Sequence, residues 1–438
     1  MKKLIEKLLC AAALSVCCAT VSAQDGAYSS YSPYSIFGVG DVYRQGTSYN
    51  KSMGGTGIAC RNNRFINYLN PAAVTARDTL SFMLDFGVIA DGRVYQQGDV
   101  KSANNLFNIY NFVFTVPIYR KSAFIAGITP YSSLGYDFSH DISDKEILAQ
   151  AGNVNYRSYG EGGLYQIFAG AGVTFFDKLS LGAQFLYYFG NIDKATIMNF
   201  SSSSFRDVYS GSTMSLDAIG GKFGIQYEQP LPSGLCITAG ATYKTPSRLR
   251  GTVSDYKYAS ISSVSDTLYN NVDTLSHGQA TKIAGEFGVG ISLKKGDKWR
   301  IEVDYLRSDW SKTRLESTTG FSSIGESRFT TTFSQSVRAG FELVPNRNDI
   351  RYYMRRCAYR GGVYYDREYY KLNGNTVNSY GITFGMTFPV FRWYNGVSVG
   401  VDLGQRGCKA NGLIRERYAM LVLGFNIHDI WFQKPKYD

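Results

Sequence analysis

The chain has 438 residues and a formal net charge of +11, and it combines 46 glycines, 34 tyrosines and 27 phenylalanines with only 10 prolines. A chain of this length often forms two or three soluble domains, but the aromatic- and glycine-rich composition favours one large β-structure. No apolar run of about 18 residues follows residue 23, which excludes a membrane-spanning helix, and no Lys/Arg block indicates a nucleic-acid ligand.

The first 23 residues have the pattern of a secretion signal. A basic start precedes a short apolar run at 8–16, and the small residues "VSA" at 21–23 form a cleavage site. We therefore expect 1–23 to be a signal peptide, leaving a mature chain of about 415 residues. Lipidation at Cys17 is the alternative, and the bulky Val16 before it argues against that reading.

The stretch "YSPYSIFGVGDVYRQGTSYNKSMGGTGIAC" at 31–60 follows neither a helical nor a strand period. Its glycines allow tight turns, and its aromatic residues can pack in small clusters. Disordered tails are poor in aromatic residues, so we expect this stretch to be folded.

From about Thr79 onward, apolar and polar residues alternate with a period of two. In "KLSLGAQFLYYFG" at 178–190 and "VSVGVDLG" at 397–404, one face is apolar and the other carries Gly, Ser, Gln and Asp. Such alternation predicts half-buried antiparallel strands, which a soluble sandwich would also have. The strands are long, their polar faces suit a wet lumen, and aromatic residues gather at their ends. These features favour a transmembrane β-barrel.

Connection lengths agree with this fold class. About fourteen strands are predicted, an even number as in outer-membrane barrels. Short links alternate with longer, polar links, which we place at 132–154, 190–206, 250–278, 311–328 and 406–412. This parity predicts a periplasmic N-terminus, short inner turns and long outer loops. The long link "VPNRNDIRYYMRR" at 344–356 falls on the short side, where we expect a short periplasmic helix.

A barrel of this size encloses a lumen that its own side chains cannot fill, because about eight strands is the packed limit. We therefore predict that residues 24–76 fold inside as a plug, with a disordered periplasmic tail as the alternative. The predicted organisation is all-β: signal peptide 1–23, plug 24–76, barrel 77–432 and periplasmic tail 433–438.

The region "SYNKSMGGTGIACRNNRFINYLNPAAVTARDTLSFMLDFGV" resembles the N-terminal part of the FadL/TodX family of long-chain fatty-acid transporters. The resemblance rests on a glycine-rich stretch, a spacer, an Asn-Pro-Ala triplet and then the first strand. It implies a fourteen-strand barrel with an N-terminal hatch in its lumen. The plug residues that we single out are Gly38, Gly40, Gly54, Gly55, Gly57, Asn70, Pro71 and Ala72.

In that family a hydrophobic ligand enters from outside, binds against the hatch and leaves sideways through a break in the third strand. Here the third predicted strand is "SAFIAGITPYSSLGY", in which Pro130 removes a ladder hydrogen bond and Gly127 and Gly135 weaken pairing. These three residues are the candidate lateral opening, although Pro130 could simply end the strand at the outer rim. The candidate ligand-binding residues of the plug are Tyr34, Ile36, Phe37, Val39 and Met53.

Catalysis and metal binding are not expected. The three histidines are His140 and His277, which we place in outer loops, and His428 at the end of the last strand. A nucleophile needs a base held within hydrogen-bond reach, and nothing in the sequence supports such a pair. No CxxC pair indicates zinc, and no cofactor is predicted. The mature cysteines, whose spacing does not reveal any pairing, are Cys60, Cys236, Cys357 and Cys408.

The sequence therefore predicts a channel in the outer membrane of a Gram-negative cell, for passive uptake of small hydrophobic, fatty-acid-like compounds. The alternative is a non-transporting barrel that serves as an accessory or shuttle subunit of a protein secretion or assembly complex, and a general porin is disfavoured by the plug. Expected partners are outer-membrane lipid, a hydrophobic small molecule or an envelope protein. The positive charge is interpreted as solvated loops, with anionic lipid headgroups as the alternative partner.

Overall fold

The computed structural model describes residues 31–77, 81–119, 121–142, 144–202, 204–261, 264–274, 281–318, 321, 329–390 and 395–430. The predicted signal peptide, the predicted tail at 433–438 and His277 lie outside these ranges. The helical pieces within them are short: η1 Pro33–Ile36, α2 Ser48–Lys51, η2 Pro71–Ala76, α3 Lys145–Ala151, η3 Pro232–Gly234, η4 Leu315–Ser317 and α4 Tyr353–Arg356. None of the helices in this part of the chain is long and apolar enough to cross a membrane.

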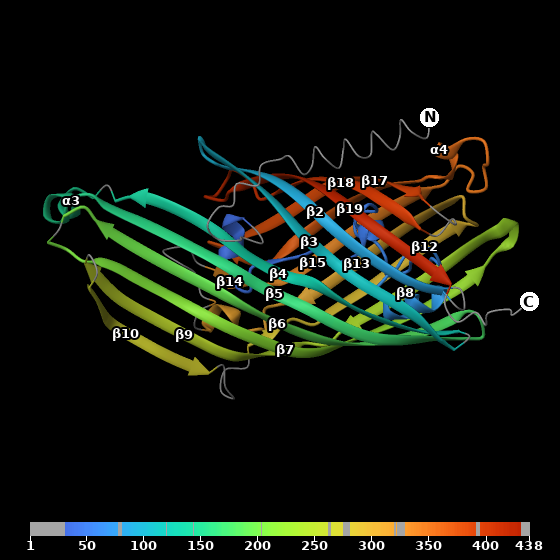
Figure 1. Ribbon diagram of the computed structural model, residues 1–438, viewed down its shortest axis with the longest axis horizontal. Helices are drawn as coiled ribbons and strands as arrows, with labels where there is room; N and C mark the ends of the chain where they lie inside the picture. Colours follow the sequence, from blue (N-terminus) through green and yellow to red (C-terminus); the bar gives the residue numbers. More distant parts are fainter. Residues whose placement is uncertain are drawn as a thin grey trace, which may run out of the picture.

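Strands account for most of the described residues (Figure 1). They are β1 Asp41–Val42, β2 Ser81–Gln97, β3 Val100–Tyr119, β4 Ser122–Asp141, β5 Val154–Phe175, β6 Leu179–Phe200, β7 Asp207–Pro230, β8 Leu235–Lys244, β9 Ser247–Ile261, β10 Val264–Thr274, β11 Lys282–Ile283, β12 Glu286–Lys295, β13 Trp299–Asp309, β14 Phe329–Thr331, β15 Phe333–Leu343, β16 Ala358–Leu372, β17 Asn375–Pro389, β18 Gly396–Arg406 and β19 Arg415–Ile430.

The sheet closes on itself, because β19 pairs with β2 from Ile430 and Ser81 to Arg415 and Gln96. In three places, successive β elements are parts of the same interrupted strand. Both β8 and β9 pair with β7, and β10, β11 and β12 follow each other along β9 and β8. Likewise β14 and β15 both pair with β16. The result is a closed antiparallel barrel of 14 strands, as the sequence predicted.

The predicted alternation has the expected directions. Apolar side chains cover the outer face, where Phe185 is 54% and Phe384 57% exposed. Their polar neighbours, such as Gln184 and Thr383, are buried on the lumenal face. A closed ladder leaves no unpaired edge in hydrocarbon, where each unsatisfied backbone group costs several kcal/mol. The outer face is therefore an apolar belt of the kind that outer-membrane barrels present to lipid.

The predicted outer loops are wrong in their extent. Residues 190–200 continue β6, and 250–261 and 264–274 form the β9–β10 hairpin rather than a loop. His140, expected in a loop, lies in β4 and packs against Tyr156 at a ring-centroid distance of 5.2 Å. Backbone pairing continues above the apolar belt because cross-strand contacts, such as the Tyr209–Tyr258 stack at 4.7 Å, stabilise polar strands as well.

The long link on the short-turn side does contain a helix, α4, as expected. The four mature cysteines are free thiols: Cys60, Cys236 and Cys357 are buried and Cys408 is exposed.

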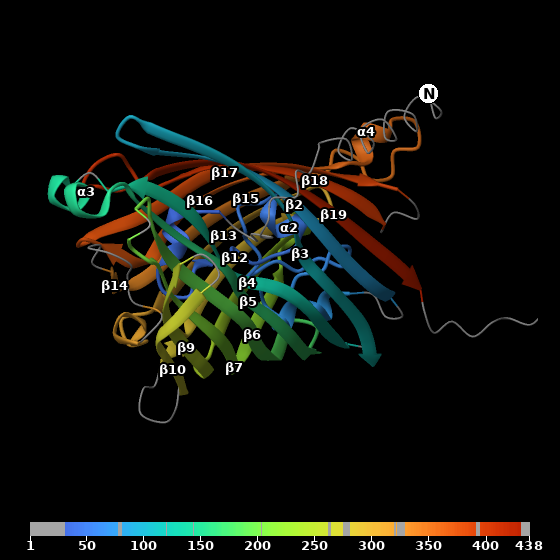
Figure 2. The same cartoon turned by 60° about the vertical axis from the view of Figure 1, so that its left-hand side comes forward.

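Residues 31–77, which we call the lumenal segment, lie inside the barrel (Figure 2). Most of their side chains are buried, and Val39, Met53 and Ile66 have no exposed surface. The segment makes only one two-residue strand, β1, and its other turns pack against the wall. Its function as a plug stays a prediction.

In one stretch of the wall, the neighbouring strands β3 and β4 do not pair with each other. The ladder between β3 and β4 runs only from Tyr119 and Ser122 to Phe112 and Ile128, although both strands continue beyond. Both views show the β2–β3 hairpin separating from β4 toward the end of the barrel opposite the turn between β3 and β4 (Figures 1 and 2). We call this separation, between residues 100–111 of β3 and 129–141 of β4, the seam.

Candidate functional site

The lumenal segment reaches the wall through rows of inward-facing glycines. A Cβ atom at Gly182 would lie 2.3 Å from the carbonyl carbon of Pro71, and one at Gly224 would lie 2.0 Å from Asn70 Oδ1. Gly182 pairs with Gly224 on one side and with Gly172 on the other, so the three form a continuous row. Only glycine permits so close an approach, and the row thereby seats the Asn-Pro-Ala turn.

Further glycines continue this contact around the lumen. The lumenal segment approaches them within 3 Å of where their Cβ atoms would lie. They are Gly240, Gly340, Gly362, Gly385, Gly400 and Gly424, which face Ile58, Met53, Ser52 and Ser48.

Asp304 of β13 holds the segment by its backbone. Its Oδ2 accepts hydrogen bonds from the backbone N–H of Gly57 at 2.7 Å and of Ile58 at 2.9 Å. The carboxyl group is 1% exposed, so these two hydrogen bonds form away from bulk water. A buried carboxylate with two backbone donors fixes the position of the turn at Gly57.

Arg300, also on β13, anchors the next residues. It donates from Nη1 to Tyr49 Oη and Cys60 Sγ, both at 2.9 Å, and from Nη2 to the Arg61 carbonyl at 2.9 Å. Burial raises the pKa of the Cys60 thiol well above its usual range, which keeps the sulfur protonated.

A second arginine fastens the start of the segment. Arg406 of β18 forms a bidentate pair with Asp41 at 2.8 and 2.7 Å and also binds Glu416 of β19 at 2.8 Å. Its Nη2 donates to Ser32 Oγ at 2.7 Å. All four side chains are buried, so removing one partner would leave an uncompensated charge.

Arg44 is the segment's own cation in the lumen. Its Nη1 lies 3.0 Å from Asp402 Oδ2, and its Nε lies 3.6 Å from Asp366 Oδ2. Nearby, Lys51 donates to the Arg44 carbonyl at 2.9 Å. Burial, with a further contribution from the Arg44 charge, lowers the pKa of Lys51 to about 7.

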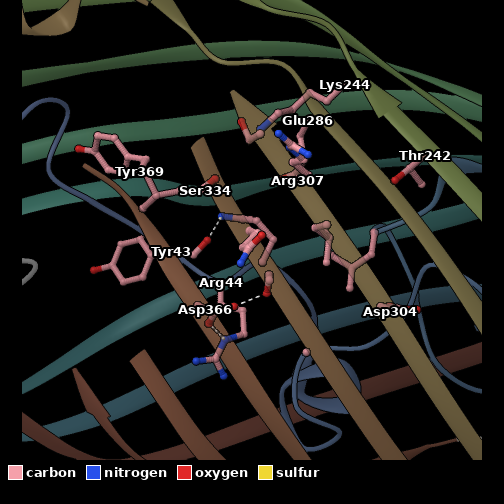
Figure 3. A pocket seen from close by; sticks show the side chains of 18 of the residues that line it. Tyr43, Arg44, Thr242, Lys244, Glu286, Asp304, Arg307, Ser334, Asp366 and Tyr369 are labelled. Carbon is pink, nitrogen blue, oxygen red and sulfur yellow. Dashed lines mark hydrogen bonds and ion pairs between the residues drawn. The ribbon is translucent and has the colours of Figure 1, made fainter. Parts of the chain in front are cut away.

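A polar cavity of about 180 Å³ lies between the segment and the wall. Figure 3 shows its charged lining, with Arg44 beside Asp366 and with Glu286 close to Lys244 and Arg307. Ligand sites for small apolar molecules are lined mainly by apolar side chains, so this cavity suits water or a polar solute better.

The predicted plug residues occupy defined places. Gly40 has φ +88° and lies against the β4 backbone, and Gly54 has φ +70° and lies against β16. Asn70 caps η2 by accepting from the Ala72 N–H, and it donates to the Ile58 carbonyl at 2.8 Å. The remaining residues also contact the barrel or the segment itself: Gly38 beside Tyr369, Gly55 beside Arg44, Gly57 at Asp304, and Pro71 on Gly182.

The candidate ligand-binding residues divide into two groups. Tyr34, Ile36, Phe37 and Val39 belong to one large buried apolar cluster, in which Phe37 stacks on Phe329 at 5.6 Å. Met53 lies in a separate small cluster with Tyr49, Cys60 and Phe65. The polar cavity of Figure 3 is lined by other residues.

The candidate opening residues lie along β4. Gly127 is within the ladder with β3, opposite Val113. Pro130 lies just above the last ladder pair, and its carbonyl accepts from Gln45 Nε2 at 2.9 Å. Above it the lumenal segment takes the place of β3: β1 pairs with Ser132 and Ser133, and Ser32 N–H donates to the Gly135 carbonyl at 2.8 Å.

Sequence reasoning missed the residues that hold the segment. Asp304, Arg300 and Arg406 are charged residues on the lumenal faces of strands. Charged side chains on such a face are a signal that something in the lumen binds them. In the sequence "WRIEVDYLRS" at 299–308, polar and apolar residues alternate and Asp304 falls on the polar face, but its partner Gly57 is 247 positions away in sequence. The inward glycine rows were visible in the sequence as a glycine excess without an assigned contact.

No group of three or more His, Cys, Asp or Glu side chains suited to a metal ion occurs in the described part of the chain.

Comparison with solved structures identifies similar barrels. The Pseudomonas putida toluene transporter TodX shares 12% identity at a TM-score of 0.58, covering 91% of this chain and 100% of the other. The Ralstonia pickettii toluene transporter TbuX shares 15% at 0.56, covering 87% and 98%. A Pseudomonas aeruginosa FadL homologue shares 11% at 0.56, covering 90% and 99%. The predicted resemblance to FadL/TodX-type barrels is thereby confirmed for the fold.

Two of these neighbours are described as toluene transporters, and at this level of identity the likeness shows the fold that the chain shares with them. No curated protein matches the chain. The family model named BamG matches residues 4–438, almost the entire sequence. On that match, this fourteen-strand barrel with an occupied lumen belongs to the BamG family.

Proposed function

We propose that this outer-membrane barrel lets small hydrophobic compounds pass passively, entering from the outer end and leaving sideways through the seam into the membrane. The observation that supports it best is the early end of the β3–β4 ladder at Phe112 and Ile128. Beyond that point the lumenal segment pairs with β4 in place of β3, through β1 at Ser132 and Ser133. Displacing this short contact would give an apolar solute a path into the membrane beside the apolar belt.

Apolar residues lead to the seam from the lumen. Tyr131, Leu134 and Tyr136 of β4 belong to the same buried cluster as Tyr34 and Phe37. A hydrophobic solute at the outer end would contact this cluster before it reaches the seam. The solved relatives described as toluene transporters and hydrocarbon channels support a ligand of this class.

The charged contacts beside the cluster support a sideways route over a straight one. Next to the cluster lie the polar cavity, which Tyr131 and Tyr369 of the cluster also line, and the ion pairs of Arg44 and Arg300. Moving an apolar solute into that region would cost free energy, because the solute would desolvate the buried charges without compensating for the lost interactions. The lumenal segment therefore acts as a plug in this proposal, with the N-terminus on the periplasmic side.

The test is uptake of a labelled monoaromatic hydrocarbon into proteoliposomes. Replacing Tyr131, which is 2% exposed at the inner edge of the seam, by Ala should speed uptake several-fold. The matched control is Tyr165→Ala, because Tyr165 pairs with Pro130 but is 44% exposed on the outer face. Equal uptake with and without the protein would refute transport.

The alternative is an accessory or shuttle subunit of a protein assembly complex in the envelope. Membership of the BamG family gives this alternative some support. The many buried anchors of the lumenal segment also favour it, because a permanently closed barrel is a scaffold rather than a conduit. Absence of uptake together with a protein that co-purifies in stoichiometric amount would favour this second function.

A further inference from the structure

The link between β15 and β16, residues 344–357, differs from the other connections at its end of the barrel. The turns at 176–178 and 296–298 have three residues each and the turn at 231–234 has four, whereas this link has fourteen. It is also well fixed. The Asn346 N–H donates to the Arg355 carbonyl at 2.8 Å, and Asp349 accepts from the N–H groups of Arg351 and Tyr352 at 2.9 and 2.7 Å.

This ordered link holds large apolar side chains away from the rest of the protein. Ile350 is 97% exposed, Met354 52% and Tyr352 48%. A single exposed apolar residue is common on protein surfaces, but a group of them on a rigid turn marks a contact surface.

The link folds onto the outside of the barrel. Tyr359 lies opposite Leu343 in the β15–β16 ladder, and Leu343 is 40% exposed on the lipid-facing side. From this outer face the Tyr359 hydroxyl donates to the Met354 carbonyl at 3.0 Å. Tyr353 similarly donates to the Pro389 carbonyl at 2.9 Å. Both views show α4 projecting outside the wall (Figures 1 and 2). The exposed residues thus continue the apolar belt at its lower edge.

Cationic side chains surround these apolar residues. The guanidinium groups of Arg351 and Arg355 lie 5.2 and 4.9 Å from the ring centre of Tyr352, and that of Arg356 lies 4.9 Å from the ring centre of Tyr353. The nearby acid, Asp349, already accepts two backbone bonds and pairs with Arg355 at 3.4 Å. Tyrosine and arginine side chains beside an apolar edge are typical of a surface that lies at a membrane interface and contacts anionic headgroups.

We propose that residues 350–356 are an interfacial anchor that inserts Ile350, Tyr352 and Met354 at the acyl-chain boundary and binds anionic phospholipid headgroups through Arg351, Arg355 and Arg356. The anchor is independent of transport, because it lies outside the lumen and away from the seam. It accounts for the one long link on a side where short turns suffice.

The first experiment locates Ile350 in the membrane. The full chain carries Cys408→Ser to remove the exposed thiol, and Ile350→Cys is labelled with a fluorophore in phosphatidylethanolamine–phosphatidylglycerol vesicles. Nitroxide-bearing lipid should quench this label as strongly as one at Phe384→Cys on the outer belt. A label at Lys178→Cys, on an exposed short turn, should instead be quenched by aqueous iodide. The proposal fails if Ile350→Cys behaves like Lys178→Cys.

The second experiment tests the headgroup preference. Native mass spectrometry after incubation with mixed phosphatidylglycerol and phosphatidylcholine should show several-fold less bound phosphatidylglycerol for the triple variant Arg351→Gln, Arg355→Gln, Arg356→Gln. The matched control removes three exposed charges far from the link: Lys101→Gln, Lys145→Gln and Lys409→Gln. Equal phosphatidylglycerol binding by both triple variants would overturn the proposal.

A protein partner is the competing occupant of this surface. A photo-crosslinking amino acid at position 350 should give lipid adducts in intact outer membranes. A discrete protein adduct at that position, absent when the crosslinker is at Lys178, would replace the lipid anchor by a protein-docking surface.

Discussion

Replacing Asp304 by Ala should loosen the middle of the lumenal segment. The substitution removes the single oxygen, Oδ2, that accepts from both the Gly57 and the Ile58 N–H groups at 2.7 and 2.9 Å. A buried donor left without an acceptor costs roughly 1–3 kcal/mol, so the local cost of leaving two is about 2–6 kcal/mol. Since about 1.4 kcal/mol is a factor of ten, the population of the locally released state should rise at least about twentyfold.

Cys60 reports that release directly, because its thiol is fully buried three residues after Gly57. In the Cys408→Ser background, we measure the rate of maleimide labelling of Cys60 by mass spectrometry. This rate should rise by about the factor estimated above, because each labelling event requires local opening. The matched control is Asp309→Ala on the same strand. Asp309 also accepts two hydrogen bonds, from Ser311 N and Oγ, but its side chain is 48% exposed and does not touch the segment. Labelling less than about threefold faster in Asp304→Ala than in Asp309→Ala would refute this reasoning.

Three further outcomes follow from the anchors. Arg406→Gln breaks a buried pair with Asp41 and should cost about 3–5 kcal/mol, seen as a lower thermal midpoint, whereas Arg157→Gln removes a half-exposed pair and should cost less than about 1 kcal/mol. Gly182→Ala places a methyl 2.3 Å from the Pro71 carbonyl carbon and should destabilise by about 1–3 kcal/mol, while Gly361→Ala, whose nearest neighbour would lie at 3.7 Å, should be close to neutral. Burial lowers the pKa of Lys51 from 10.5 to about 7, so between these pH values the folded state binds fewer protons than the unfolded chain. The free energy of unfolding should therefore rise as the pH increases from about 7 to 10.5. In denaturant titrations, Lys51→Met should remove this pH dependence.

Local patterns predicted the barrel because each strand repeats the same physical requirement. The alternation at 397–404 alone sets Val401 outward, at 38% exposed, and Asp402 inward, at 7% exposed. The period failed where a strand is interrupted. In "IAGEFGVGISL" at 283–293, Ile283 has the spacing of the outward-facing Phe287 and Val289, yet it is buried in the core because β11 ends there and β12 begins only at Glu286.

The anchors could not be predicted because they join distant parts of the chain. Arg406 and its partner Asp41 are 365 positions apart, and neither residue has a distinctive local context. The seam is similar: Pro130 lies just beyond the last β3–β4 ladder pair, but the sequence did not reveal that the lumenal segment would pair with β4 there in place of β3. The loop ends were predicted wrongly because the strands beyond the apolar belt are polar on both faces. Such strands lack the apolar alternation by which a strand is recognised in a sequence.

The most direct measurement of the central claim is the single-channel conductance of the barrel without its lumenal segment. Deleting residues 24–70 and reconstituting the folded chain in a planar bilayer should give a large, steady aqueous pore, because the remaining wall is wider than its own side chains can fill. The complete mature chain should conduct little. If the shortened chain folds, as judged by its heat-dependent gel mobility, and conducts no more than the complete one, the lumen is closed by something other than residues 31–70 and the account is wrong.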